Sequence, residues 1–319
     1  MGVPLKVERG GRVFPVSDRS FDVSGALERR LKSLRVSLVR DRAVDLEIED
    51  HEVRGVSGER RRYAAQAVIL ATGGISYPAT GSTGDGHRMA ERAGHTVTPL
   101  QGSLVPLQGT LDNGASCARL QGLGLRNVGV TVFENQKKIY TDLGELLFTH
   151  FGVSGPLVLS ASAHMRCFGK KAYHLEIDLK PALDEQTLDR RLLSDFEKYA
   201  NHDFCNALQD LLPQKLIPVM VEASGIPPHQ KVHEITREQR RALLLKFKHF
   251  VVKISAPCPV EEAIVTSGGI RVNEVNPTTM ESKLVKGLYF AGELLDVDAY
   301  TGGFNLQIAW ATGRAAGMA

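Results

Sequence analysis

Apolar residues recur with two different periods along this chain of 319 residues, and the changes of period indicate how it is organised. From Asp22 to Leu34 the apolar side chains are three or four residues apart, which predicts a helix. Strands are predicted at 36–39 and 43–48. The unbroken apolar run 67–70 is typical of a parallel strand that is buried on both faces. This alternation of helices and strands indicates an α/β fold.

The pattern changes twice in the middle of the chain. From about residue 102 to 181 apolar residues alternate with polar ones, as in 128–133 and 172–179, which predicts a small β-barrel or sandwich. Residues 184–249 return to helical spacing, strand character reappears from Val251, and the α/β pattern returns from Gly268. We therefore predict three parts: an α/β domain of residues 1–101 and 268–319, a barrel-like domain of residues 102–183 and 250–267, and a helical insert of residues 184–249.

Composition places few limits on the partner. Hydrophobic residues make up 43% and charged residues 24% of the chain, which is ordinary for a soluble globular protein. The net charge of +3 is too small to indicate nucleic acid or membrane, and the basic run 237–249 is more often a solvated helix face. The start resembles no signal peptide, and the four cysteines form no Cys-x-x-Cys pair. We expect a cytoplasmic protein that acts on a small molecule, with no metal site and no nucleic-acid or membrane partner.

The end of the chain carries the most informative motif. A short apolar strand, 288–291, runs into Gly292 and Glu293, and Gly302 and Gly303 then precede a helix. The free N–H groups of such a helix start attract an electron-rich group. A strand end, an acid and a helix start together predict a flavin site, although Gly-Gly alone is more often an ordinary loop. The predicted cofactor-binding residues here are Gly292, Glu293, Gly302, Gly303, Phe304, Asn305 and Leu306.

A second cofactor segment is predicted where the strand 67–70 ends. Open α/β sheets bind ligands at the carboxyl ends of their strands, so Ala71, Thr72, Gly73 and Gly74 are expected to approach the cofactor. A tight turn without a ligand is the alternative.

Three segments together resemble a known family: Leu70–Gly86, Leu147–Pro156 and Met280–Val285, the last leading into the closing motif. The chain is similar to FAD-dependent flavoproteins that include aminoacetone oxidase and the bile-acid 3-dehydro-reductase, commonly labelled NAD(P)/FAD-dependent oxidoreductases. The resemblance implies an α/β fold with a two-dinucleotide-binding (glutathione-reductase-like) FAD domain, an inserted β-barrel-like domain and a helical insert. It implies FAD as cofactor, with NAD(P)H or oxygen as the redox partner. It also implies that the backbone of Val44 binds the adenine of FAD, with simple core packing an equal alternative.

One departure from that family is large. The family begins with a strand–helix–strand unit that carries Gly-x-Gly-x-x-Gly, and this chain has no such sequence. We expect an FAD domain that is incomplete at its N-terminus, through truncation rather than natural variation, and weak or absent FAD binding by the chain alone.

The catalytic prediction rests on three residues near these motifs. FAD performs the hydride chemistry itself, so the protein need supply only orientation and one acid or base. His150, Tyr300 and Asn305 are the candidates, each of them more often a turn or cap residue. Two other functions stay open: a fumarate-reductase-like flavoenzyme and a truncated, non-catalytic remnant. The sequence does not identify the substrate, the redox partner or the oligomeric state.

Overall fold

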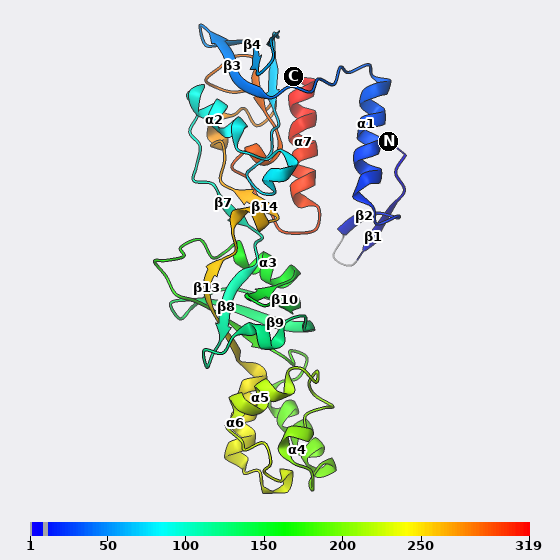
Figure 1. The fold of residues 1–319 in the computed structure, drawn as a ribbon, viewed down its shortest axis with the longest axis vertical. Helices are drawn as coiled ribbons and strands as arrows, with labels where there is room; N and C mark the ends of the chain where they lie inside the picture. The colour runs from blue at the N-terminus through cyan, green and yellow to red at the C-terminus, as the bar shows by residue number, and fades with distance from the viewer. Residues whose placement is uncertain (1, 9–11) are drawn as a thin grey trace. The chain divides into compact units, whose positions relative to one another are not determined.

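The computed structural model of the chain describes residues 2–8 and 12–319, drawn in Figure 1. These residues fold as two compact units. We call them the α/β unit, Met1–Ser103 with Ala263–Ala319, and the barrel unit, Leu104–Glu262. Most of the predicted barrel-like domain and the whole predicted helical insert thus fall together in one unit, whereas residues 102–103 and 263–267, predicted in the barrel, belong to the α/β unit.

Within the described residues, the first segment of the α/β unit contributes the strands β1–β7 and its second segment contributes β14 and β15. Three α-helices, α1, α2 and α7, complete the unit. These are β1 (Leu5–Glu8), β2 (Arg12–Pro15), α1 (Ser20–Ser33), β3 (Ala43–Glu49), β4 (Glu52–Gly58), β5 (Arg62–Ala64), β6 (Val68–Leu70), α2 (Asp85–Arg92), β7 (Gln101–Ser103), β14 (Val265–Ser267), β15 (Leu288–Phe290) and α7 (Phe304–Met318). The strands pair as the hairpin β1–β2, the antiparallel sheet β3–β4–β5, the antiparallel pair β14–β7 and the parallel pair β15–β6. The unit is therefore a Rossmann-like α/β fold with mixed sheets.

The core of the α/β unit surrounds the parallel pair. Val68 and Leu70 of β6 and Leu288 and Phe290 of β15 are buried in one cluster with residues of α2. Ile69, between the two buried residues of β6, is 43% exposed. The prediction of a strand buried on both faces is therefore wrong for β6: it alternates, because only one face of this two-stranded sheet is covered in the described part of the chain.

The N-terminal segment departs from the sequence-based expectations in two places. The helix α1 forms as predicted, but its apolar stripe is open: Phe21 is 78% exposed and Leu27 40%, and only Ala26 is buried. The predicted strand 36–39 does not form, since these residues adopt no regular structure. Their β-branched residues favour a strand, but they pair with no other strand within the described residues.

The barrel unit is a closed six-stranded barrel with helices packed on it. Its elements are β8 (Leu107–Leu111), β9 (Gly124–Glu134), β10 (Lys137–Phe148), β11 (Gly152–Ser154), α3 (Pro156–Ser162), β12 (Tyr173–Asp178), α4 (Glu185–Lys198), α5 (Ile217–Ser224), α6 (Arg237–Lys248) and β13 (Phe250–Pro257). The strands close in the order β10–β11–β8–β13–β12–β9, and all neighbours are antiparallel.

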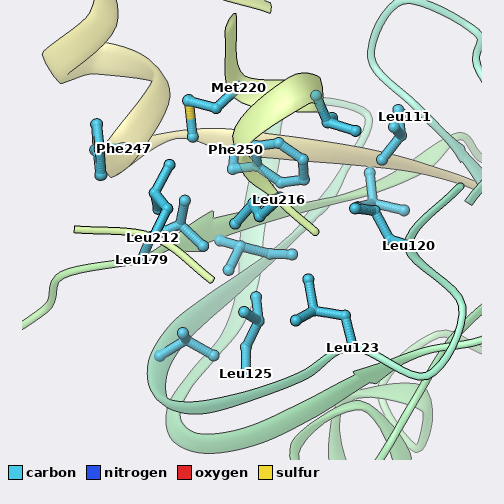
Figure 2. Packing of buried hydrophobic residues seen from close by; sticks show 14 of the residues in the cluster. Leu111, Leu120, Leu123, Leu125, Leu179, Leu212, Leu216, Met220, Phe247 and Phe250 are labelled. Carbon is cyan, nitrogen blue, oxygen red and sulfur yellow. The ribbon is translucent and has the colours of Figure 1, made fainter. Parts of the chain in front are cut away.

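Two helices of the barrel unit, α4 and α6, start at side-chain caps. Asp184 accepts a hydrogen bond from the Thr187 backbone at the start of α4, and Thr236 and Gln239 form a reciprocal capping box at the start of α6. Figure 2 shows residues of the helical segment, among them Leu216 and Met220, in one apolar cluster with Phe250 of β13. The barrel and the helices therefore share a single core.

Within the described residues, no helix has both the length and the apolar character needed to cross a membrane.

Candidate functional site

The parallel pairing of β6 with β15 places two predicted cofactor segments side by side, at the carboxyl ends of the two strands, which we call the β6–β15 edge. Leu288 is opposite Val68 and Phe290 is opposite Leu70, and the Ala291 N–H continues the ladder to the Leu70 carbonyl at 3.0 Å. Ala71 therefore leaves the sheet at the same edge as Gly292. The sequence predicted each segment separately, and the strand register brings them together.

Glu293 holds this edge to a third segment. Its Oε1 accepts a hydrogen bond from the buried backbone N–H of Thr266 at 2.6 Å. The Thr266 hydroxyl in turn accepts from the N–H groups of Ile75 and Ser76, at 2.8 and 3.2 Å. A side chain at Gly74 would place its Cβ 2.1 Å from Thr266 Oγ1 and 2.6 Å from Glu293 Oε1, so close packing explains this glycine.

The buried side chain of His95 packs against β15. His95 is 4% exposed, its Nε2 lies 2.7 Å from Ser282 Oγ and its Nδ1 lies 3.2 Å from a Glu274 carboxylate oxygen. The ring meets Phe290 of β15 edge-on, with the centroids 4.8 Å apart. Burial lowers the pKa of His95, and Glu274 opposes that effect only in part. At neutral pH the His95 ring is therefore uncharged, and its hydrogen bonds to Ser282 and Glu274 hold it against Phe290 of β15.

Two buried polar side chains lie near the first turn of α2: Thr72, whose Oγ1 has no hydrogen-bond partner among the described residues, and His87, whose ring nitrogens make no well-aligned hydrogen bond and have the Leu294 backbone as their polar neighbour. His87 is 2% exposed, and burial lowers its pKa. A Cβ at Gly86 would lie 2.0 Å from Thr72 Oγ1, so Thr72 faces α2 directly. An unsatisfied hydroxyl beside a predicted cofactor segment is a local energetic cost, of the kind that active sites concentrate.

The start of α7 leaves its first N–H groups available. Gly302 and Gly303 have left-handed φ angles of 117° and 96°, and no side chain caps the helix. The first helical hydrogen bond runs from the Gln307 N–H to the Gly303 carbonyl, and a Cβ at Gly303 would have nothing within 4 Å. Phe304 and Leu306 are 57% and 58% exposed. An open, uncapped helix start fits an electron-rich ligand edge.

Asn305 and Gly292 have their polar groups engaged inside the protein. The Asn305 side chain accepts from the Ala299 N–H at 2.9 Å and donates to the Ala299 carbonyl at 2.7 Å, which fastens the loop before α7. The Gly292 N–H donates to Thr312 Oγ1 of α7 at 2.9 Å. Both residues therefore position the site through the backbone they hold.

The remaining predicted residues lie in three different places. Val44 is at a register shift of the β3–β4 ladder, is 50% exposed, and accepts a hydrogen bond at its carbonyl from Arg92 at 2.8 Å. Tyr300 is 44% exposed in the loop before α7. His150 is exposed in the β10–β11 turn of the barrel unit, edge-on to Phe151. His150 belongs to the barrel unit and Tyr300 and Asn305 to the α/β unit, so their grouping in one site stays a prediction.

Comparison with known proteins gives a whole-chain match. The sequence profile of the HI0933-like protein Rossmann domain matches residues 1–319. The chain belongs to the HI0933-like family. Membership of this Rossmann-domain family implies a dinucleotide cofactor such as FAD.

The chain is similar to three proteins with named activities. The 3-dehydro-bile acid delta(4,6)-reductase of Clostridium scindens is 32% identical over 317 residues, which cover 98% of this chain and 76% of that protein. The ribosomal RNA dihydrouridine synthase of Haemophilus influenzae is 32% identical over 257 residues, covering 81% and 61%. That of Escherichia coli is 31% identical over 247 residues, covering 77% and 58%. The chain thus spans about three fifths of the length of the two synthases.

Sequence reasoning missed the residues of this HI0933-like site that act through distant contacts. Thr266 lies 27 residues before Glu293 and about 190 after Ile75, and His95 is 187 residues from Ser282. One sequence signal could have located Thr266: it lies at a strand end that two glycines follow, in the segment Thr266-Ser267-Gly268-Gly269. Within the described residues, no group of three or more His, Cys, Asp or Glu side chains could hold a metal ion.

Proposed function

We propose that this protein is an FAD-dependent reductase of carbon–carbon double bonds conjugated to a carbonyl group. The observation that carries the proposal is the common edge at which the parallel strands β6 and β15 end, next to the uncapped start of α7. Ligands of open α/β sheets bind at such strand ends. The family match supports the cofactor class, and the names of the relatives support the reaction class.

The residues at this edge fit a flavin in three respects. Gly73 and Gly303 have positive φ angles, which favour glycine, but a Cβ at Gly73 would lie 2.9 Å from Ser82 Oγ, so the backbone is open to a ring or a phosphate only at Gly303. The space around a Cβ at Gly303 is open. The Thr72 hydroxyl is a buried polar atom without a partner among the described residues, so this segment has hydrogen-bonding capacity that the protein itself leaves unused.

In this proposal Ala71–Gly74 and Gly292–Glu293 hold the cofactor, and Val44 contributes at the bulge of β3. When bound, reduced FAD supplies the hydride for the two-electron reduction. The first N–H groups of α7, at Phe304, Asn305 and Leu306, favour negative charge on the group placed against them. Asn305 keeps that helix start in place by fastening Ala299.

The substrate class follows from what the names of the relatives have in common. One name describes the removal of double bonds from a 3-dehydro bile acid, and the other the conversion of uridine to dihydrouridine. In both substrates the double bond is conjugated to a carbonyl, so reduction adds a hydride to one carbon and a proton to the other. The proton needs an acid: Tyr300 is the candidate in the α/β unit, and His150 the candidate in the barrel unit.

The test combines cofactor and substrate. The purified protein is mixed with excess FAD and reduced anaerobically with NADH or NADPH, and reoxidation is followed by flavin absorbance. The substrates are a 3-oxo steroid with a conjugated double bond, a uridine-containing ribosomal RNA fragment, and fumarate. We expect reoxidation and a product heavier by two hydrogens with the steroid or the RNA. Reoxidation by fumarate alone would favour the fumarate-reductase-like alternative, and no interaction with FAD would favour the non-catalytic one.

A further inference from the structure

The segment between β15 and α7 is fastened through the side chain of Asp298. Its Oδ2 accepts a hydrogen bond from the Ser103 hydroxyl of β7 at 2.7 Å, and its Oδ1 accepts one from the Ser267 hydroxyl of β14 at 3.0 Å. Both serines are 2% exposed. Hydrogen bonds to a carboxylate are stronger than those between neutral groups, and a buried hydroxyl that loses its acceptor is destabilising. Asp298 therefore holds this segment to two strands at once.

The strand β14 also connects Asp298 to the segment that follows the predicted cofactor residues 71–74. Thr266 and Ser267 are neighbours in β14, so their side chains point to opposite faces. The Thr266 hydroxyl accepts from the N–H groups of Ile75 and Ser76, whereas the Ser267 hydroxyl donates to the carboxylate. One short strand thus binds both of the segments between which we place the flavin.

Tyr300 lies in a loop that is fixed on both sides. On one side Asp298 is bound to β7 and β14. On the other side the Asn305 side chain of α7 binds the Ala299 N–H at 2.9 Å and the Ala299 carbonyl at 2.7 Å. The Tyr300 side chain is 44% exposed between these two attachments. The position of the Tyr300 backbone relative to β14 therefore depends on the carboxylate of Asp298.

We propose that Asp298 is a positioning residue for the reduction and that it acts through Tyr300, the candidate acid of the α/β unit. Both of its carboxylate oxygens are bound to serine hydroxyls, so its effect passes through the loop rather than directly to the substrate. A displacement of about 1 Å in a reacting group can slow a reaction about 100-fold. This inference rests on the proposed reductase function.

Hydrogen–deuterium exchange of the full chain without FAD tests whether Asp298 fastens the loop. Asp298→Ala removes both acceptors and should speed exchange in peptides that cover residues 297–305 by about tenfold, the effect of roughly one net hydrogen bond. Asp298→Asn should retain wild-type exchange, because its amide oxygen accepts from one serine and its NH₂ group donates to the other. Ser103→Ala and Ser267→Ala each remove one bond and should have smaller effects than Asp298→Ala.

The loop contains a matched control for the loss of charge. Asp296 lies two residues before Asp298, and its side chain makes no hydrogen bond or ion pair in the part of the chain that the structure describes. Asp296→Ala should therefore leave exchange in the same peptides unchanged. Chemical denaturation of each variant separates a local effect on the loop from a loss of the whole fold.

Reoxidation of FAD-loaded, reduced protein by a substrate that the wild type accepts tests the positioning role. Asp298→Ala should lower the rate constant at saturating substrate by about tenfold, with a smaller change in KM, and Asp298→Asn should restore it. The double variant with Tyr300→Phe should be no slower than the slower single variant, because both changes affect the same group. Ser57→Ala removes a 2.8 Å hydroxyl–carboxylate bond to Glu47 elsewhere in the α/β unit and should leave the rate unchanged.

Failure of this inference differs from failure of the proposed function. Unchanged exchange in Asp298→Ala would show that the carboxylate does not fasten the loop. Faster exchange with a wild-type rate constant, or additive effects of Asp298→Ala and Tyr300→Phe, would overturn the positioning role. A wild type that reduces none of the substrates would contradict the proposed function, and exchange without FAD would still decide whether Asp298 fastens the loop.

Discussion

The Glu293 carboxylate and the Thr266 backbone N–H are joined by a 2.6 Å hydrogen bond that ties the end of β15 to β14. Thr266 is 1% exposed, so its N–H depends on this acceptor. Glu293 is thus both a predicted cofactor ligand and a structural connection, and its two roles can be separated by substitution.

Glu293→Ala should lower the free energy of unfolding by about 1–3 kcal/mol, because a buried donor loses its partner. Glu293→Gln retains an acceptor oxygen and should recover most of that loss. If the free carboxylate oxygen also binds a cofactor hydroxyl, both variants should weaken FAD binding, by about 1–3 kcal/mol for the alanine. Chemical denaturation and FAD titration measure the two effects. Unchanged FAD affinity in both variants would leave Glu293 with the structural role alone.

Gly303→Val should impair the start of α7. The residue has a φ of 96°, where a β-branched side chain is strained by about 1–3 kcal/mol, and its bulk would fill the open space in front of the helix. We expect weaker FAD binding and a lower reduction potential of any flavin that binds. Gly313→Ala, in the middle of the same helix with free space at its Cβ, is the control and should stabilise α7 by about 1 kcal/mol. A Gly303→Val protein that binds FAD with an unchanged potential would show that α7 does not face the flavin.

His87→Leu should stabilise the protein at neutral pH, by about 1–3 kcal/mol, since it replaces a buried imidazole that makes no well-aligned hydrogen bond and has only a weak contact with the Leu294 backbone. Denaturant titration at pH 7.5 measures the change. A loss of several kcal/mol would mean that the imidazole makes a contact on which the fold depends.

Stability should fall as the pH drops below about 6.5, the pKa of an unfolded histidine. Burial lowers the pKa of His87 and of His95, so in that range the unfolded chain binds protons that the folded chain does not. Each buried histidine contributes at most about 1.4 kcal/mol per pH unit to this slope. His87→Leu should make the slope shallower. The same slope in wild type and variant would show that His87 does not titrate differently in the folded state.

Two of the four thiols should react slowly. Cys117 and Cys258 are buried, and burial raises the pKa of each to about 11, so neither forms much thiolate at neutral pH. Cys167 and Cys205 are partly exposed. A thiol-specific reagent should modify Cys167 and Cys205 first, and mass spectrometry of the labelled peptides identifies the order. Early modification of Cys117 would indicate that the barrel core opens.

The sequence predicted those parts of the fold that local patterns determine. The strands around Val68 and Leu288, and the glycine-opened helix at Phe304, lie where the apolar runs and glycines indicated. The same local reading failed at 36–39, because a strand also needs a partner strand, and none lies beside that run among the described residues.

The site could be predicted only residue by residue, because its connections are long-range. That Asn305 fastens Ala299, and that Thr266 joins Glu293 to Ile75, follows from folded geometry and not from spacing.

We propose that the flavin binds where β6 and β15 end and α7 begins. Hydrogen–deuterium exchange of the full chain, with and without FAD in large excess, tests it most directly and detects weak binding as well. We expect slower exchange in peptides that cover residues 71–76 and 302–308, and unchanged exchange in peptides from the barrel strands. FAD-dependent protection that is confined to the barrel unit, or that omits both 71–76 and 302–308, would contradict it.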